Sequence, residues 1–239
     1  IAVDSNTAVS VLEGMQQYKG NSLNYVKGLD LTTLEPTFLT EVQYNTTDKS
    51  GFEAAKNAAK EADVVVMVLG EHGFSSGEAR SRTNLDLPGL QQEFLEEIYK
   101  VNPNIVLVLN NGRPLTISWA AEKIPTIVEA WQLGTETGNA VAQVLYGDYN
   151  QSGKLPMSFP RNIGQVPIAY NHYSTGRFTN KDNNVFWSHY SDVEKTPLYP
   201  FGYGLSYTTF EYSNLKINKK TFSKGEKVEV SVDLKNTGK

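Results

Sequence analysis

The sequence predicts an α/β fold, with a mostly parallel sheet and helices on both of its faces, followed by the opening strands of a β-sandwich. The first part is predicted by short, wholly apolar runs that alternate with segments of helical periodicity, as in βαβ units. These runs lie at residues 64–69, 105–110 and 126–131. The second part is predicted by the alternation of hydrophobic and polar residues after Glu211. We therefore expect an α/β sandwich of the flavodoxin-like kind over residues 1–210 and an incomplete second domain over residues 211–239.

The remaining elements follow from local pattern. Apolar residues recurring every three or four positions predict helices at residues 7–18, 52–62, 89–101, 118–122 and 134–148. A further short strand is expected at residues 22–28, and the polar stretch at 32–52 predicts a loop. Beyond Tyr149 the chain is rich in Pro, Gly and aromatic residues, so we expect it to wrap over the core. After Glu211, two or three strands with a Lys-Gly turn are expected.

Composition excludes several classes of function. A net charge of −4 gives no footprint for nucleic acid, and no apolar run approaches the roughly 20 residues of a membrane span. The chain has no cysteine, and His72, His172 and His189 lack the spacing of a zinc site, so no metal is expected. Neither a dinucleotide-binding glycine pattern nor a phosphate loop is present, so no cofactor is expected. The sequence has no start methionine and ends within strand-like alternation, which predicts a piece of a longer protein.

The loop after the first apolar run holds most of the ionisable chemistry. Ligands of an open parallel sheet bind at the carboxyl ends of its strands, where this loop lies. Its ionisable residues are Glu71, His72, Glu78, Arg80 and Arg82. Two readings stay open: a carboxyl group held as a general acid, or carboxylates paired with the arginines in a solvated loop. Glu71 follows the strand directly and suits an anchor, Glu78 lies toward the tip, and His72 suits local hydrogen bonding.

Three weaker motifs are also present. The stretch GTETGNA around Thr135 predicts either a helix cap with amides facing an anion or close packing of a helix, and we favour packing. Asn45 and Asn150 begin glycosylation sequons by pattern alone.

Several blocks in fixed order resemble the family 3 glycoside hydrolases, and within them the bacterial periplasmic β-glucosidases. The blocks are VVVMVLGE, SGEARSRTNLDLPGLQQEFLEEI, IVLVLNNGRPLTI, IVEAWQLGTETGNAVAQVLYGDYNQSGKLPMSFP and LYPFGYGLSYTTFEYS. The resemblance runs from about Val9 to Lys239 and implies an (α/β)6 sandwich domain followed by the start of a fibronectin type III-like domain. In the family an N-terminal barrel carries the aspartate nucleophile, so the resemblance implies that this chain holds no nucleophile.

The same resemblance separates the two glutamates. SGEARSRTNLDLP is similar to the family's acid/base loop, which implies that Glu78 is the general acid/base and Arg82 the family arginine. Glu71 matches a supporting position, and Arg80 is expected to help hold the loop. Ala79 and Ser81 stand where many members have glycine and aspartate, a departure that bears on loop geometry and substrate choice.

The function implied is that of the C-terminal domain of a retaining β-glucosidase-like enzyme, inactive without its barrel. Its partners would be that barrel and β-linked glucosides or oligosaccharides, in the periplasm or outside the cell. A non-catalytic carbohydrate-binding domain is the alternative. A flavodoxin-like nucleotide-binding module is disfavoured because the chain lacks a phosphate-cradling loop.

Overall fold

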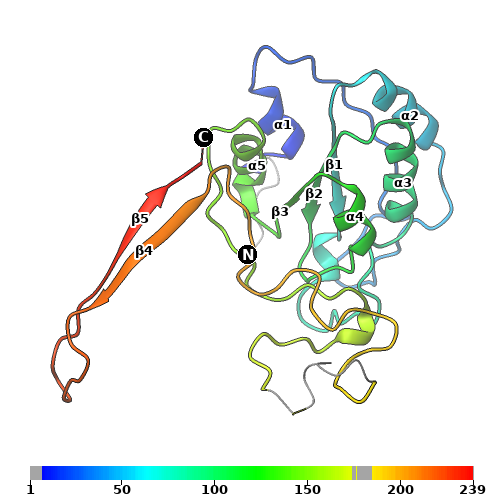
Figure 1. Ribbon diagram of the computed structural model, residues 1–239. Coiled ribbons are helices and arrows are strands. Elements are labelled where there is room, and N and C mark those ends of the chain that lie inside the picture. Colours follow the sequence, from blue (N-terminus) through cyan, green and yellow to red (C-terminus); the bar gives the residue numbers. More distant parts are fainter. Residues whose placement is uncertain (1–6, 174–175, 177–184, 239) are drawn as a thin grey trace.

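A three-stranded parallel sheet forms the centre of the domain (Figure 1). The computed structural model describes residues 7–173, 176 and 185–238. The strands are β1 (Val65–Gly70), β2 (Ile105–Asn110) and β3 (Thr126–Glu129), in the order β1-β2-β3. The strands predicted at the three apolar runs are therefore confirmed, and parallel pairing brings their carboxyl ends to one edge.

Helices cover both faces of this sheet, as predicted (Figure 1). One face is covered by α2 (Phe52–Glu61), α3 (Gln91–Val101) and α4 (Ser118–Lys123), and the other by α1 (Val11–Gln16) and α5 (Thr137–Leu145). Alternate strand residues supply the two cores, because successive side chains of a strand point to opposite faces. Leu107 lies in the larger core with α2, α3 and α4, whereas Val108 packs with α1 and α5.

Helix α1 is shorter than predicted and lies against α5. Ser10 caps it, and Ser10 and Glu13 form a reciprocal capping box that fixes where the helix begins. The two helices approach so closely that a Cβ on Gly14 would lie 2.1 Å from the carbonyl oxygen of Gly138. Gly138, the second glycine of GTETGNA, therefore allows the two helices to pack closely. Helix α5 follows a 3-10 turn (Gly134–Glu136) and has no side-chain cap, so Thr135 does not cap it.

One sequence prediction is wrong. Residues 22–28 form no strand, although Val26 packs against the larger core. Leu23 and Tyr25 are exposed and Val26 is only partly buried, so the segment is an irregular surface stretch that the local pattern alone does not distinguish from a strand. The loop over residues 32–52 is largely irregular as predicted, with one isolated bridge between Thr32 and Tyr44, and α2 begins at its end.

The segment beyond Tyr149 contacts the larger core at several described residues. Phe159 is 1% exposed and lies in the larger core, and a bridge pairs it with Tyr199. A 3-10 turn (Ile163–Gln165) is its one regular element among the residues described between 150 and 209.

The chain ends in a two-stranded antiparallel hairpin of β4 (Phe210–Ile217) and β5 (Val230–Asn236). Figure 1 shows the hairpin extending away from the α/β layers, and every residue of both strands is exposed. The pairs Tyr212–Leu234 and Ile217–Val230 line an apolar face. Such a face is typical of half a sandwich, and the assignment of 211–239 to a separate domain stays a prediction.

Candidate active-site loop

The loop that follows β1 begins with a close backbone crossing. Gly70 has φ +143°, and a Cβ there would lie 1.9 Å from the carbonyl oxygen of Asn110 on β2. The N–H of Glu71 donates to the same oxygen at 2.8 Å. Only glycine fits this position, so β1 ends at a fixed point and delivers Glu71 to the carboxyl edge of the sheet.

The Glu71 carboxylate is the centre of a buried ion cluster. Its side chain is 0% exposed. Arg82 Nη1 donates to Oε1 at 2.6 Å, and Arg113 Nε lies 3.1 Å from Oε1 and 3.2 Å from Oε2. The Gly112 N–H donates to Oε2 at 3.2 Å. All of these partners belong to the protein, and the Glu71 side chain has no exposed surface, an arrangement suited to anchoring and unsuited to proton transfer to a substrate.

Arg113 was not recognised from the sequence. Besides contacting Glu71, its Nη2 donates to the carbonyl oxygens of Ser75 and Arg80, the latter at 3.0 Å, and to Ser76 Oγ at 3.3 Å. One guanidinium therefore joins both stems of the loop over residues 75–80. A signal existed: Arg113 lies in NNGRP, directly after the second buried strand, and parallel strands end at the same edge.

Glu78 lies at the tip of this clamped loop. It is exposed and has no ion pair or hydrogen bond to any residue that the structure describes. Gly77 precedes it at φ +123°, and Ala79 follows at φ +59°, in the left-handed region. The Arg80 N–H donates to the Gly77 carbonyl at 3.2 Å and closes the turn. A free carboxyl group is thus carried on a short turn whose backbone is fixed on either side.

Arg80 and His72 contact neighbouring parts of the protein rather than Glu71 or Glu78. Arg80 pairs with Glu41 at 3.0 Å and donates to the Phe38 carbonyl at 2.9 Å, so it binds the 32–52 loop rather than Glu71. His72 Nδ1 accepts the Phe74 N–H at 3.1 Å, and its ring lies 5.2 Å from that of Phe74. His72 therefore caps the short 3-10 turn Gly73–Ser75.

Glu129, another carboxyl group at this edge of the sheet, was not recognised from the sequence. Burial raises the pKa of Glu129, at the end of β3, to about 7. The Trp131 N–H donates to Oε1 at 3.0 Å and Asn111 Nδ2 lies 3.4 Å from Oε2, and both oppose that rise only in part. Trp131 has φ +49°, so the chain turns sharply after the strand.

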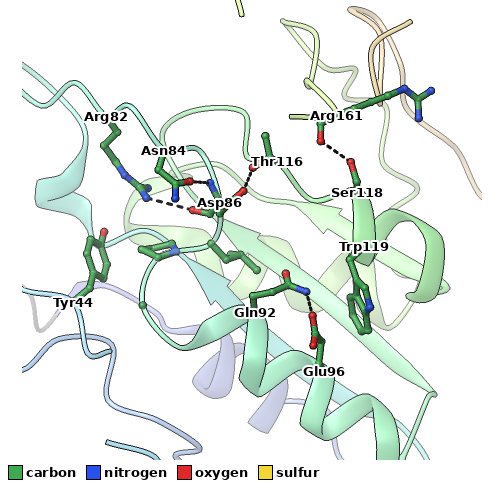
Figure 2. A pocket seen from close by; sticks show the side chains of 13 residues that line it. Tyr44, Arg82, Asn84, Asp86, Gln92, Glu96, Thr116, Ser118, Trp119 and Arg161 are labelled. Carbon is green, nitrogen blue, oxygen red and sulfur yellow. Dashed lines mark hydrogen bonds between the residues drawn. The ribbon is translucent and has the colours of Figure 1, made fainter. Parts of the chain in front are cut away.

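A cavity of about 670 Å³ opens beside the ion cluster (Figure 2). The loop over residues 82–89 forms one wall, and the first turns of α3 and α4 form another. Arg82 belongs to both features, since its Nη2 also donates to the Asp86 carbonyl at 3.3 Å. Glu78, Arg80 and His72 do not line this cavity.

The sequon asparagines are engaged in the fold. Asn45 is 1% exposed, its Oδ1 accepts the N–H groups of Thr47 and Asp48, and its Nδ2 donates to the Asp48 carbonyl. Asn150 Oδ1 accepts from Ser206 and Tyr207.

Within the described residues, no group of three or more His, Asp or Glu side chains is arranged to hold a metal ion. None of the described helices has the length and apolar character needed to cross a membrane.

The fold and the loop define an α/β domain that presents a carboxyl group at the carboxyl edge of a parallel sheet. Comparison with known families matches residues 1–207 to the glycosyl hydrolase family 3 C-terminal domain. The chain belongs to glycoside hydrolase family 3, which confirms the resemblance seen in its sequence blocks.

Similar proteins agree with this assignment. A periplasmic beta-glucosidase of Salmonella typhimurium is 43% identical, with 98% of this chain and 32% of the relative covered. A beta-xylosidase of Formosa agariphila is 42% identical over 97% of this chain and 30% of its own length. Among solved structures, a β-glucosidase from Erythrobacter marinus superposes with TM-score 0.81 at 34% identity, covering 97% of this chain and 32% of that one. A Listeria innocua beta-glucosidase in complex with isofagomine gives TM-score 0.79 at 35% identity, covering 97% and 30%.

The chain thus spans about a third of the length of the relatives it matches. It is a C-terminal domain of β-glucosidase-like glycoside hydrolases.

Proposed function

We propose that this chain supplies the general acid/base of a retaining β-glucosidase-like hydrolase, and that Glu78 is the residue. The observation that carries the proposal is the contrast between the two loop glutamates. Glu71 is buried with two arginines, whereas Glu78 is exposed and unpaired among the described residues. A group that transfers protons to a substrate must be accessible to it, and of these two glutamates Glu78 alone meets that condition.

Retaining hydrolysis needs a second carboxyl group. The two stand about 5–5.5 Å apart, one as nucleophile and one as acid/base. Glu78 donates its proton to the glycosidic oxygen as the bond to the sugar breaks and the nucleophile bonds to the sugar carbon. Glu78 then removes a proton from water, whose oxygen displaces the nucleophile. We assign the nucleophile to an N-terminal barrel outside this chain, so the chain alone is inactive.

The other loop residues position Glu78 in this proposal. Arg82 and Arg113 lock Glu71 at the base of the loop, and Arg113 also joins its two stems. Arg80 ties the loop to residues 38–41, and His72 caps its first turn. None of these four side chains is assigned a proton-transfer role.

The substrates we propose are β-linked glucosides or oligosaccharides. Support comes from the names of the relatives, beta-glucosidases and a beta-xylosidase, and from the Listeria innocua enzyme, a mutant of which was solved in complex with laminaribiose. We place the parent protein in the periplasm or outside the cell, by similarity to the Salmonella typhimurium enzyme. The net charge of −4 favours neither nucleic acid nor an anionic membrane surface as a partner.

The test compares the chain alone with the chain joined to an N-terminal barrel of the family. Hydrolysis of an aryl β-glucoside is expected only for the joined protein, with retention of configuration at the anomeric carbon. Hydrolysis by the chain alone would overturn the assignment of the nucleophile to a barrel. Undiminished hydrolysis by a joined protein carrying Glu78→Gln would overturn the role of Glu78.

A further inference from the structure

The cavity beside the ion cluster has the size of a ligand site. Its volume of about 670 Å³ lies within the range of roughly 300–1,000 Å³ that is typical of small-molecule sites, enough for an oligosaccharide of a few rings. The walls come from rigid parts of the fold. Leu87 and Pro88, both buried, line it. The first turns of α3 and α4 contribute Gln92 and Trp119 (Figure 2).

Several polar atoms that line the cavity have no partner among the described residues. Asp86 Oδ1 accepts from Thr116 Oγ1, which leaves Oδ2 without a partner. Glu96 Oε1 accepts from Gln92 Nε2 at 2.8 Å, which leaves Glu96 Oε2 and Gln92 Oε1 without a partner. Asn84 Oδ1 accepts the Asp86 N–H at 2.7 Å, so its amino group is also available. Carboxylate and amide acceptors are therefore combined with an amide donor around one hollow (Figure 2).

Trp119 adds an aromatic surface to this polar set. Its indole is half-buried, and the ring of Tyr99 meets it edge to face at 5.5 Å, which fixes its orientation. The indole N–H has no partner among the described residues and is a further donor. An indole face packs against the C–H face of a pyranose ring, while the ring's hydroxyls need both acceptors and donors.

The charges of the cavity disfavour anionic ligands. The two arginines that line the cavity already have partners, since Arg82 donates to Glu71 and to the Asp86 carbonyl and the Arg161 side chain donates to Thr196. Figure 2 shows the Arg161 guanidinium directed away from the cavity. With Asp86 and Glu96 facing it, the hollow repels anions such as phosphates. A neutral molecule rich in hydroxyl groups satisfies the unpaired atoms without an uncompensated charge.

We propose that this cavity is a binding site for β-linked gluco-oligosaccharides, separate from the Glu78 loop. It would hold a distant part of a longer substrate on the same domain that delivers the acid/base. The glucoside class of the ligand rests on the proposed function, whereas the presence of a neutral sugar site rests on the cavity itself.

Binding can be measured on this chain without catalysis. In ¹⁵N-labelled protein, cellotriose and laminaritriose should shift the indole N–H signal of Trp119 and the side-chain amide signals of Asn84 and Gln92 in a saturable way. Trp119→Phe identifies the indole signal among those of the three tryptophans. Glu96→Gln and Asp86→Asn keep the shape of the cavity but remove a charged acceptor, and each should weaken binding by about tenfold.

Two controls separate this site from the proposed active site. Glu61→Gln, an exposed change on α2, should leave binding unchanged, and so should Glu78→Gln. The absence of saturable shifts at the solubility limit of both sugars would overturn the proposal. So would sugar-induced shifts that Glu96→Gln leaves unweakened. Shifts confined to residues 75–80 would place the sugar on the Glu78 loop and likewise refute a separate site.

Discussion

Arg113 is the residue whose replacement tests the loop architecture most sharply. Arg113→Met keeps the length of the side chain but removes its contact with Glu71 and its hydrogen bonds to the Ser75 and Arg80 carbonyls. Removing one partner of a buried ion pair costs about 3–5 kcal/mol. Glu71 would keep Arg82 and the Gly112 N–H, so we expect a loss near the lower end, about 3 kcal/mol.

The assay is urea unfolding of the chain, combined with amide hydrogen exchange. Arg113→Met should lower the free energy of unfolding by about 3 kcal/mol and speed exchange at residues 76–80 more than at β2. Arg113→Lys keeps the charge without the planar fork and should recover only part of the loss. Arg161→Met, which removes two hydrogen bonds to Thr196 and no carboxylate contact, is the matched control and should cost less than about 1 kcal/mol.

Two results would refute this reasoning. A cost below about 1 kcal/mol for Arg113→Met would mean that the buried cluster does not need its second arginine. Full recovery by Arg113→Lys would mean that charge alone, rather than simultaneous binding of both loop stems, holds the loop.

Three further substitutions test the backbone and the electrostatics of the same edge. Ala79→Gly should raise the free energy of unfolding by up to about 1 kcal/mol in urea titrations, because φ +59° costs glycine less than it costs alanine, and destabilisation would contradict the left-handed geometry. Gly70→Ala should cost at least about 3 kcal/mol by the same assay, since its Cβ would meet the Asn110 carbonyl, and a neutral effect would contradict the crossing. Burial raises the pKa of Glu129 from 4.5 to about 7, so the native state binds the proton more tightly, and stability should fall as pH rises through that interval. The pKa difference of about 2.5 units, at about 1.36 kcal/mol per unit, limits this loss of stability to about 3 kcal/mol. Glu129→Gln should remove the dependence of the unfolding free energy on pH in this interval. An unchanged pH dependence would assign it to another group.

The sheet and its helices were predictable because burial leaves a periodic trace in the sequence. The apolar run at Val64–Leu69 gave β1 to within a residue, and the alanine-rich segment gave α2. The same signal failed at residues 22–28, where Leu23 and Tyr25 are exposed and Val26 is only partly buried, with no strand partner. A short run that contains apolar residues therefore does not by itself establish that the segment is a buried strand.

The partners of the charged side chains in the loop after β1 could be predicted from the sequence only in part. Pairing of arginines with loop carboxylates was one of the open readings, and Arg82 does reach Glu71. Arg80 instead pairs with Glu41, in a loop whose position no local pattern defines. Arg113 lies just after β2, and Glu129, whose pKa is raised, is the last residue of β3. Both follow from the parallel arrangement once every loop at the carboxyl edge is considered, rather than the most charged one.

The central claim is that Glu78 transfers the proton, and its most direct test is leaving-group dependence. In the chain joined to a barrel, Glu78→Ala should lower kcat/KM about 10²–10⁴-fold for β-glucosides with basic leaving groups, and much less for those with acidic leaving groups. Azide should then restore turnover and yield the β-glucosyl azide, while Glu61→Gln should behave as the unmodified protein. An equal loss of activity for every leaving group, with no azide product, would contradict the assignment of Glu78 as the acid/base.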